Sequence, residues 1–175
     1  MLDRIARLLR HRWHEPAAVR RALPPAALER LARRVQASEQ RHSGEIRLYV
    51  EAGLPGRYLW RRGTLRDVIR ARALSIFGKL RVWDTEHNNG VLIYLLLAER
   101  AIEIVADRGI SRHVPGADWQ AMMARMGVAF RAGRFEEGLT QALEEISAVL
   151  VEHFPVTPGE ANPNELPDRP EVRGP

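Results

Sequence analysis

The clearest pattern in the chain is an uncharged run of branched residues at 91–98, followed by an alternating segment at 101–107. A short run without charges predicts a strand covered on both faces. The alternation of Ile102, Ile104 and Ala106 with more polar neighbours is typical of a strand nearer the edge of a sheet. A short turn at Glu99 and Arg100 would join the two strands as an antiparallel hairpin.

The remaining pattern predicts a third strand at residues 45–50 and helices around it. Apolar residues at helical spacing predict helices from about 24 to 42, from 64 to 79, after Pro115 and Gly116, and from Phe135 onward. Thr64 and Asp67 resemble a capping box. The stripe expected to be buried in that helix is Ala71, Leu74, Phe77 and Leu80. A strand, helix, strand connection of this length is normally parallel and right-handed. We therefore expect a small α/β domain whose mixed sheet combines this parallel unit with the antiparallel hairpin, flanked by helices.

The hairpin predicts which loops lie together. Pairing Ala98 with Ala101 would place Gly90 opposite Gly109, because antiparallel partners keep a constant sum of residue numbers. Residues 84–89 would then meet residues 107–112 at one end of the sheet. The start of the parallel strand, residues 43–45, would lie at the same end.

Composition indicates one domain with appendages. The chain has 175 residues, 45% hydrophobic and 28% charged, which is enough for a proper core. We divide it into an N-terminal helix (1–23), the α/β domain (24–154) and a proline-rich tail (155–175) expected to be disordered. The absence of cysteine excludes disulfides and thiolate chemistry. The longest apolar run, eight residues, is too short for a transmembrane helix.

Positive charge is concentrated at the start of the chain. Residues 1–34 hold nine arginines and three acidic residues, whereas residues 35–154 hold 16 basic and 15 acidic residues. Wound as a helix, residues 1–14 place Leu2, Ile5, Leu9 and Trp13 opposite an arginine-rich face. This helix could dock on its own domain, lie on an anionic membrane surface or enter the groove of an acidic protein partner. Nucleic-acid binding would rest on charge alone and is disfavoured. No secretory signal is recognisable, so we expect a cytoplasmic location, peripheral to the membrane.

The converging loops carry the candidate chemistry. Carboxylate and amide oxygens suit Ca²⁺ or Mg²⁺. The candidate ligands are Glu45, Asp84, Asn88, Asn89 and Asp107. In the alternative interpretation, Asp84 and Asn88 cap the loop and Asn89-Gly90 adopts a left-handed turn. His87 and His113 are expected near this end as well.

Several of these residues resemble one known family. They are Ser43-Gly44-Glu45, Trp83-Asp84-Thr85, the strand opening Asn89-Gly90-Val91-Leu92, the hairpin end at 104–110, and Phe130, Arg131 and Gly133 before the last helix. Over about residues 25–154 this pattern resembles the TPM domain family. Members occur in bacteria and thylakoids and include proteins described as acid phosphatases.

Two functions follow from this resemblance together with the loops. The first is a non-catalytic module that binds a ligand or an unknown protein partner, holds a divalent cation and acts in envelope- or membrane-associated assembly. The second is a metal-dependent phosphatase for phosphate monoesters. In that mechanism Asp84 would hold the cation that activates a water, and Arg108 would stabilise charge on the phosphoryl oxygens.

Overall fold

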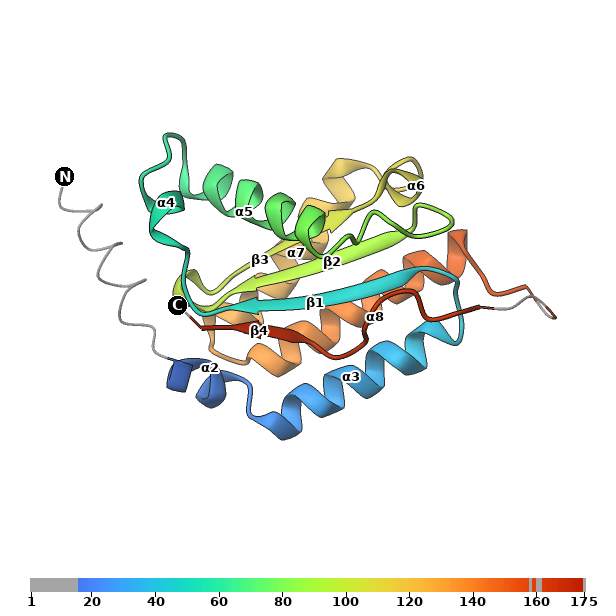
Figure 1. Cartoon of the computed structure of the whole chain (residues 1–175), viewed down its shortest axis with the longest axis horizontal. Coiled ribbons are helices and arrows are strands. Elements are labelled where there is room, and N and C mark those ends of the chain that lie inside the picture. The colour runs from blue at the N-terminus through green and yellow to red at the C-terminus, as the bar shows by residue number, and fades with distance from the viewer. Residues whose placement is uncertain (1–15, 158, 160–161, 175) are drawn as a thin grey trace.

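A four-stranded mixed sheet forms the centre of the computed structural model, which describes residues 16–157, 159 and 162–174 (Figure 1). The strands are β1 (Glu45–Glu51), β2 (Gly90–Leu96), β3 (Ala101–Ala106) and β4 (Glu171–Arg173), in the spatial order β3-β2-β1-β4. Strand β1 pairs in parallel with β2 and β4, and β2 pairs antiparallel with β3. The predicted fold class is therefore confirmed. The predicted helix of residues 1–14 lies outside the described residues.

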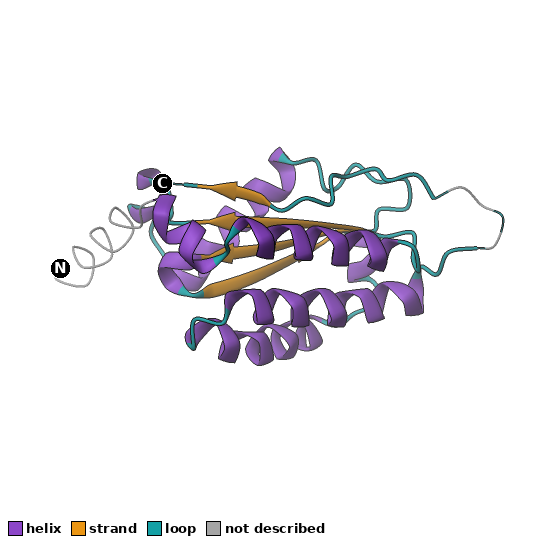
Figure 2. Cartoon of the chain, turned by 90° about the horizontal axis from the view of Figure 1, so that it is seen from below, coloured by secondary structure: helices purple, strands orange, loops and turns teal. Residues whose placement is uncertain are grey.

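Helices cover both faces of this sheet (Figures 1 and 2). They are α2 (Pro16–Ala22), α3 (Pro25–Glu39), α4 (Gly56–Leu59), α5 (Leu65–Lys79), α6 (Arg108–Ser111), α7 (Gly116–Arg131) and α8 (Phe135–His153). One core packs α3, α7 and α8 on the sheet, and a second core packs α4 and α5 on the opposite face. Every residue of β1 and β2 is buried as a result. Within the described part of the chain, no helix combines the length and apolarity that crossing a bilayer requires.

Helix α5 begins as predicted, and its buried face is partly the predicted one, because Phe77 and Leu80 pack against the second core. The side chain of Thr64 accepts a hydrogen bond from the backbone N–H of Asp67, and the carboxylate of Asp67 accepts one from the N–H of Thr64, so the capping box is present. Leu74, predicted to be buried, is 48% exposed. The buried residues are Val68, Ile69, Arg72, Ala73 and Ile76. Arg72 is among them because its guanidinium pairs with the buried carboxylate of Glu51 in β1.

The hairpin register also differs from the prediction, by two residues. Val91 lies opposite Ala106, not opposite Arg108. The cause is the connection: residues Leu97–Glu99 form a 3-10 turn (η1), and Arg100 adopts the left-handed conformation with φ 48°. This longer turn starts the pairing at Leu96 and Ala101.

The C-terminal tail was predicted to be disordered, and this prediction was wrong for its described residues. Strand β4 pairs with β1 through Tyr49 and Glu171, Val50 and Val172, and Glu51 and Arg173. Upstream, the side chain of Asn162 donates to the backbone carbonyl of Glu39 at 2.9 Å. The tail is therefore the fourth strand of the sheet with its approach segment.

Buried charges on β1 hold the tail in place. The guanidinium of Arg47 donates to the backbone carbonyls of Pro167 and Arg169. The carboxylate of Glu45 accepts from the backbone N–H of Leu166 at 3.0 Å, and Leu166 is itself buried in the second core. Proline removes backbone donors, but these contacts use carbonyls and one N–H, so a proline-rich segment can still dock.

Candidate functional site

The two predicted loops meet at the amino end of β2. The backbone N–H of Gly109 donates to the carbonyl of Asn88 at 3.0 Å, and the N–H of Asp107 donates to the carbonyl of Gly90 at 2.9 Å. The guanidinium of Arg108 adds a bond of 3.1 Å to the side-chain oxygen of Asn88. The predicted convergence is therefore confirmed for residues 88–90 and 107–109.

Two glycines allow this close approach. A Cβ on Gly90 would lie 1.9 Å from the carbonyl oxygen of Val82, and one on Gly109 would lie 2.5 Å from that of Asn88. The left-handed residue before the strand is Asn88, with φ 52°, and not the Asn89-Gly90 pair. Gly90 is required here by steric contact with backbone.

Two of the predicted metal ligands are engaged elsewhere. Asp84 is exposed and forms an ion pair with Arg81 at 2.6 Å. Glu45 is buried and accepts from the tail backbone; burial raises the pKa of this carboxyl, and nearby Glu165 and Asp168 also raise it, against hydrogen bonds that lower it. Over residues 16–157, 159 and 162–174, no three or more His, Cys, Asp or Glu side chains are arranged to hold a metal.

The other buried candidates each keep one oxygen without a hydrogen-bond partner among the described residues. Asn89 is fully buried; its side-chain nitrogen lies 3.3 Å from the hydroxyl of Ser43, while its Oδ1 has no partner. Asp107 caps α6 by accepting from the N–H of Arg108 through Oδ1, while its buried Oδ2 has no partner. One such oxygen therefore lies on each of the two converging loops.

The predicted histidines have separate surroundings. His113 stacks on His153 of α8 with ring centroids 4.6 Å apart and meets Phe154 edge-on. His87 instead lines a small hollow of about 120 Å³ with Glu86 and Glu165 of the tail. His87 and His113 therefore lie in different surroundings and do not share a contact.

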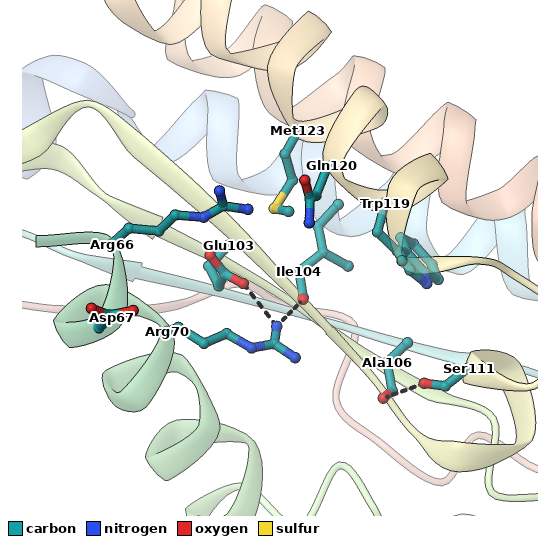
Figure 3. A pocket seen from close by; sticks show the side chains of 11 residues that line it. Arg66, Asp67, Arg70, Glu103, Ile104, Ala106, Ser111, Trp119, Gln120 and Met123 are labelled. Carbon is teal, nitrogen blue, oxygen red and sulfur yellow. Dashed lines mark hydrogen bonds and ion pairs between the residues drawn. The ribbon is translucent and has the colours of Figure 1, made fainter. Parts of the chain in front are cut away.

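A larger feature, not predicted from the sequence, is a groove along the free edge of β3 (Figure 3). Its cavity of about 310 Å³ adjoins a second hollow of about 660 Å³ that shares Arg66, Glu103, Gln120 and Met123. Arg66 and Arg70 extend from α5 toward β3, and Gln120 and Met123 extend from α7 on the other side (Figure 3). A pocket of this size is in the usual range for ligand sites.

The backbone of β3 presents donors to this groove. Asp107 and Gly90 are a hydrogen-bonded pair, so the alternating residues Ile102 and Ile104 direct their N–H and C=O groups away from β2. The carbonyl of Ile104 already accepts from Arg70, whose guanidinium also pairs with Glu103 at 2.8 Å. The N–H groups of Ile102 and Ile104 have no backbone partner among the described residues. The sequence signal was the i, i+4 pair of Arg66 and Arg70, which is indistinguishable from a solvated helix face without the fold.

A buried network of charged side chains lies at the carboxyl end of β1. Glu51 accepts two hydrogen bonds from Arg72, at 2.6 and 2.9 Å, and one from the hydroxyl of Tyr94 at 2.6 Å. Burial, followed by the adjacent Glu51 carboxylate, raises the pKa of Tyr94. The Arg72 guanidinium also lies 5.2 Å from the ring of Tyr58 in α4. This network ties α4 and α5 to the sheet.

Comparison with known proteins gives both a family and a fold. A sequence model described as the TPM domain matches residues 20–149. The NMR structure of the protein BA42 from the psychrophilic bacterium Bizionia argentinensis has a TM-score of 0.70 and 24% identity, covering 86% of this chain and 95% of that one. The N-terminal domain of a protein from P. gingivalis has a TM-score of 0.56 and 22% identity, covering 75% and 80%. No curated protein matches the chain. At these identities the two structures show a common fold alone.

Proposed function

This chain belongs to the TPM domain family, and we propose that it is a non-catalytic binding module that receives an extended, acidic segment of a protein partner in the groove along β3. The observation that carries the proposal is the outer edge of β3, which no strand of the described residues pairs with and which lies between two helices that contact it. An edge strand with outward backbone groups is a template for adding a strand from a partner. Such a module would serve assembly at the cell envelope.

The chemistry of the groove favours an acidic segment. Its open groups are mainly donors: the outward N–H groups of Ile102 and Ile104, and the guanidinium of Arg66, for which the described residues provide no ion pair. Of the outward carbonyls, that of Ile104 accepts from Arg70 and that of Ala106 from Ser111, so the carbonyl of Ile102 is the acceptor left among the described residues. Glu103 is neutralised by Arg70, and Asp67 is occupied by the capping box. A donor-rich groove selects a ligand rich in acceptors, which carboxylates supply.

An NMR titration of the full chain tests this proposal. The probe is the acetylated peptide Thr-Val-Glu-Val-Thr-Val-Glu, compared with the same peptide carrying Lys in place of Glu. We expect saturable amide shifts at Ile102 and Ile104 with the Glu peptide only. Arg66→Glu should weaken binding at least about fivefold, because it replaces an attraction of about 1 kcal/mol by a repulsion.

The matched control is Arg33→Glu, which changes an exposed arginine of α3 on the face of the sheet opposite to α5 and Arg66. It should leave binding unchanged. Equal binding of both peptides, shifts centred on β4, or equal losses in the two variants would refute the groove as the binding site.

A second candidate function, cation binding, is favoured by the unpartnered oxygens of Asn89 and Asp107. Buried oxygen acceptors without donors are costly, and Ca²⁺ or Mg²⁺ would satisfy them together with backbone carbonyls. Titration with CaCl₂ and with MgCl₂ should then shift amides within residues 84–90 and 107–109. Asp107→Asn should abolish the shifts while keeping the helix cap, since Asn also caps helices.

Asp118→Asn, an exposed substitution at the start of α7, is the control for removing one negative charge. Asp84→Asn decides whether Asp84 leaves Arg81 to join the cation. If both metals leave the loop amides unshifted, cation binding at this end is excluded. The simpler account would then be that the Asn89 amide is rotated, so that its oxygen accepts from Ser43.

A further inference from the structure

A second surface lies at the opposite end of the sheet, in the loop that follows β1. This Trp60 loop, residues 53–63, carries Arg57, Arg61 and Arg62 and no acidic residue. Trp60 is 71% exposed, the largest value among the large hydrophobic side chains of the described residues. The loop therefore combines a solvent-exposed indole with three guanidinium groups.

The loop is fixed to the domain, so the exposure of Trp60 is a property of the fold. The preceding residues of α4, Tyr58 and Leu59, are buried in the second core. The guanidinium carbons of Arg57 and Arg61 lie 5.3 and 5.7 Å from the centre of the Tyr58 ring, within cation–π range. With its neighbours packed inward, the short helix ends and Trp60 faces solvent.

Further basic residues lie at the same end of the molecule as the Trp60 loop. Helix α2 lies at the same end of the molecule as α4 (Figure 1) and carries Arg20 and Arg21 in its last turn. Positive charge from two separate segments thus gathers at one end.

A single exposed hydrophobic residue is common on protein surfaces, and solvated arginines are too. Their combination in one loop that itself holds no acidic residue favours a ligand of matching chemistry; the nearby carboxylate of Asp67 is engaged in the capping box with Thr64. A nucleic-acid strand would need several exposed aromatic rings for base stacking, whereas Tyr58 is buried here. A membrane interface needs one indole at the level of the headgroups and cations beside lipid phosphates.

We propose that the Trp60 loop docks this end of the domain onto an anionic lipid bilayer, with Trp60 in the headgroup region and Arg57, Arg61 and Arg62 facing the phosphates. The docked surface is remote from the loops of the candidate cation site, which lie at the amino end of β2. Lipid docking and cation binding can therefore be tested separately.

Flotation of the full-length protein with lipid vesicles in EDTA measures this docking without any divalent cation. Vesicles of phosphatidylcholine with phosphatidylglycerol should carry the protein, and vesicles of phosphatidylcholine alone should not. Arg61→Ala combined with Arg62→Ala should lower the partition coefficient about 25-fold, taking about fivefold for each arginine near an anionic surface. Trp60→Ala should lower it as well.

Two control variants match these changes elsewhere. Val128→Ala removes an exposed hydrophobic side chain of α7 that is 55% exposed, and Arg33→Ala removes one exposed charge of α3. Val128→Ala should leave flotation unchanged, and Arg33→Ala should lower it by no more than the loss of one distant charge. Circular dichroism of each variant checks that it is folded. Binding that persists in the Trp60 loop variants, or that is equal for neutral vesicles, would overturn the proposal, as would binding of a single-stranded oligonucleotide that competes away the vesicles.

Discussion

Replacing Glu51 with Gln is expected to cost about 3–5 kcal/mol in the free energy of unfolding, because it leaves a buried guanidinium without its counter-charge. Glu51 and Arg72 are each 1% exposed. The carboxylate holds both nitrogens of the Arg72 fork and also accepts from the hydroxyl of Tyr94. A neutral amide of the same shape keeps part of this hydrogen bonding, so most of the loss comes from the charge. Arg173, 4.0 Å from Glu51 but half exposed, can turn to water.

The pair formed by Arg70 and Glu103 is a matched control on the same face of the sheet. Its nitrogen and oxygen lie 2.8 Å apart, close to the 2.6 Å of Arg72 and Glu51, but the Arg70 side chain is 44% exposed. Water can solvate Arg70 when its partner is neutralised. We therefore expect Glu103→Gln to cost about 1 kcal/mol or less.

Urea unfolding followed by far-UV circular dichroism measures both variants under identical conditions. Tyr94→Phe, which removes only the third hydrogen bond to Glu51, should lie between them at about 1.5–3 kcal/mol. The reasoning fails if Glu51→Gln and Glu103→Gln differ by less than about 1 kcal/mol, the size of a surface pair, because burial would then not control the strength of the pair.

Three further predictions concern the other end of the sheet. Burial raises the pKa of Glu39 to about 8; a backbone hydrogen bond opposes this shift, and Glu45 and Asp168 reinforce it. The folded state therefore keeps a proton that the unfolded chain loses near the ordinary pKa of 4.5. Stability should fall as pH rises through this window, by about 2 kcal/mol between about pH 6.5 and 8, and thermal unfolding of Glu39→Gln should lack this slope. Leu166→Asp should release the tail and expose amides of β1 to hydrogen exchange with little loss of helix, whereas unchanged protection would mean that β4 is held without Leu166. Hydrolysis of p-nitrophenyl phosphate should be undetectable with CaCl₂ or MgCl₂, and turnover abolished by Asp84→Ala would establish the phosphatase instead.

Much of the fold could be predicted because local patterns and topology rules agree. Most of the apolar run at 91–98 became the fully buried strand β2, which ends at Leu96, and the box of Thr64 and Asp67 began α5 as expected. The parallel connection and the hairpin then located residues 88–90 beside residues 107–109 without any knowledge of side-chain contacts. Convergence of this kind depends on strand direction, which tolerates an error of two residues in register.

Buried charges explain most of what could not be predicted. Glu45, Arg47 and Glu51 alternate along β1 in the way that a solvent-facing side of a strand would. Each is nevertheless buried, because Glu45 and Arg47 bind the tail and Glu51 binds Arg72. Periodicity counts such residues as exposed, so it selected Leu74 and not Arg72 for the core of α5. The tail was assigned to disorder from its proline content, which does not reveal the buried charges of β1 that bind it.

Pairing of polar side chains with nearby groups also limited the prediction of the candidate site, and the atoms left without a partner indicate where a ligand would bind. Selection by residue type took most of the carboxylates and amides near the converging loops as potential ligands, but polar side chains at strand ends first satisfy nearby backbone and charge. Asp84 pairs with Arg81, and Glu45 with the N–H of Leu166. What remains after these local demands are the oxygens of Asn89 and Asp107, which no residue in the described chain satisfies. A binding site is therefore better identified by polar atoms that the fold leaves unpaired than by the number of ligand-type residues, and these two atoms make Asp107→Asn a sharper test of cation binding than any substitution of Asp84.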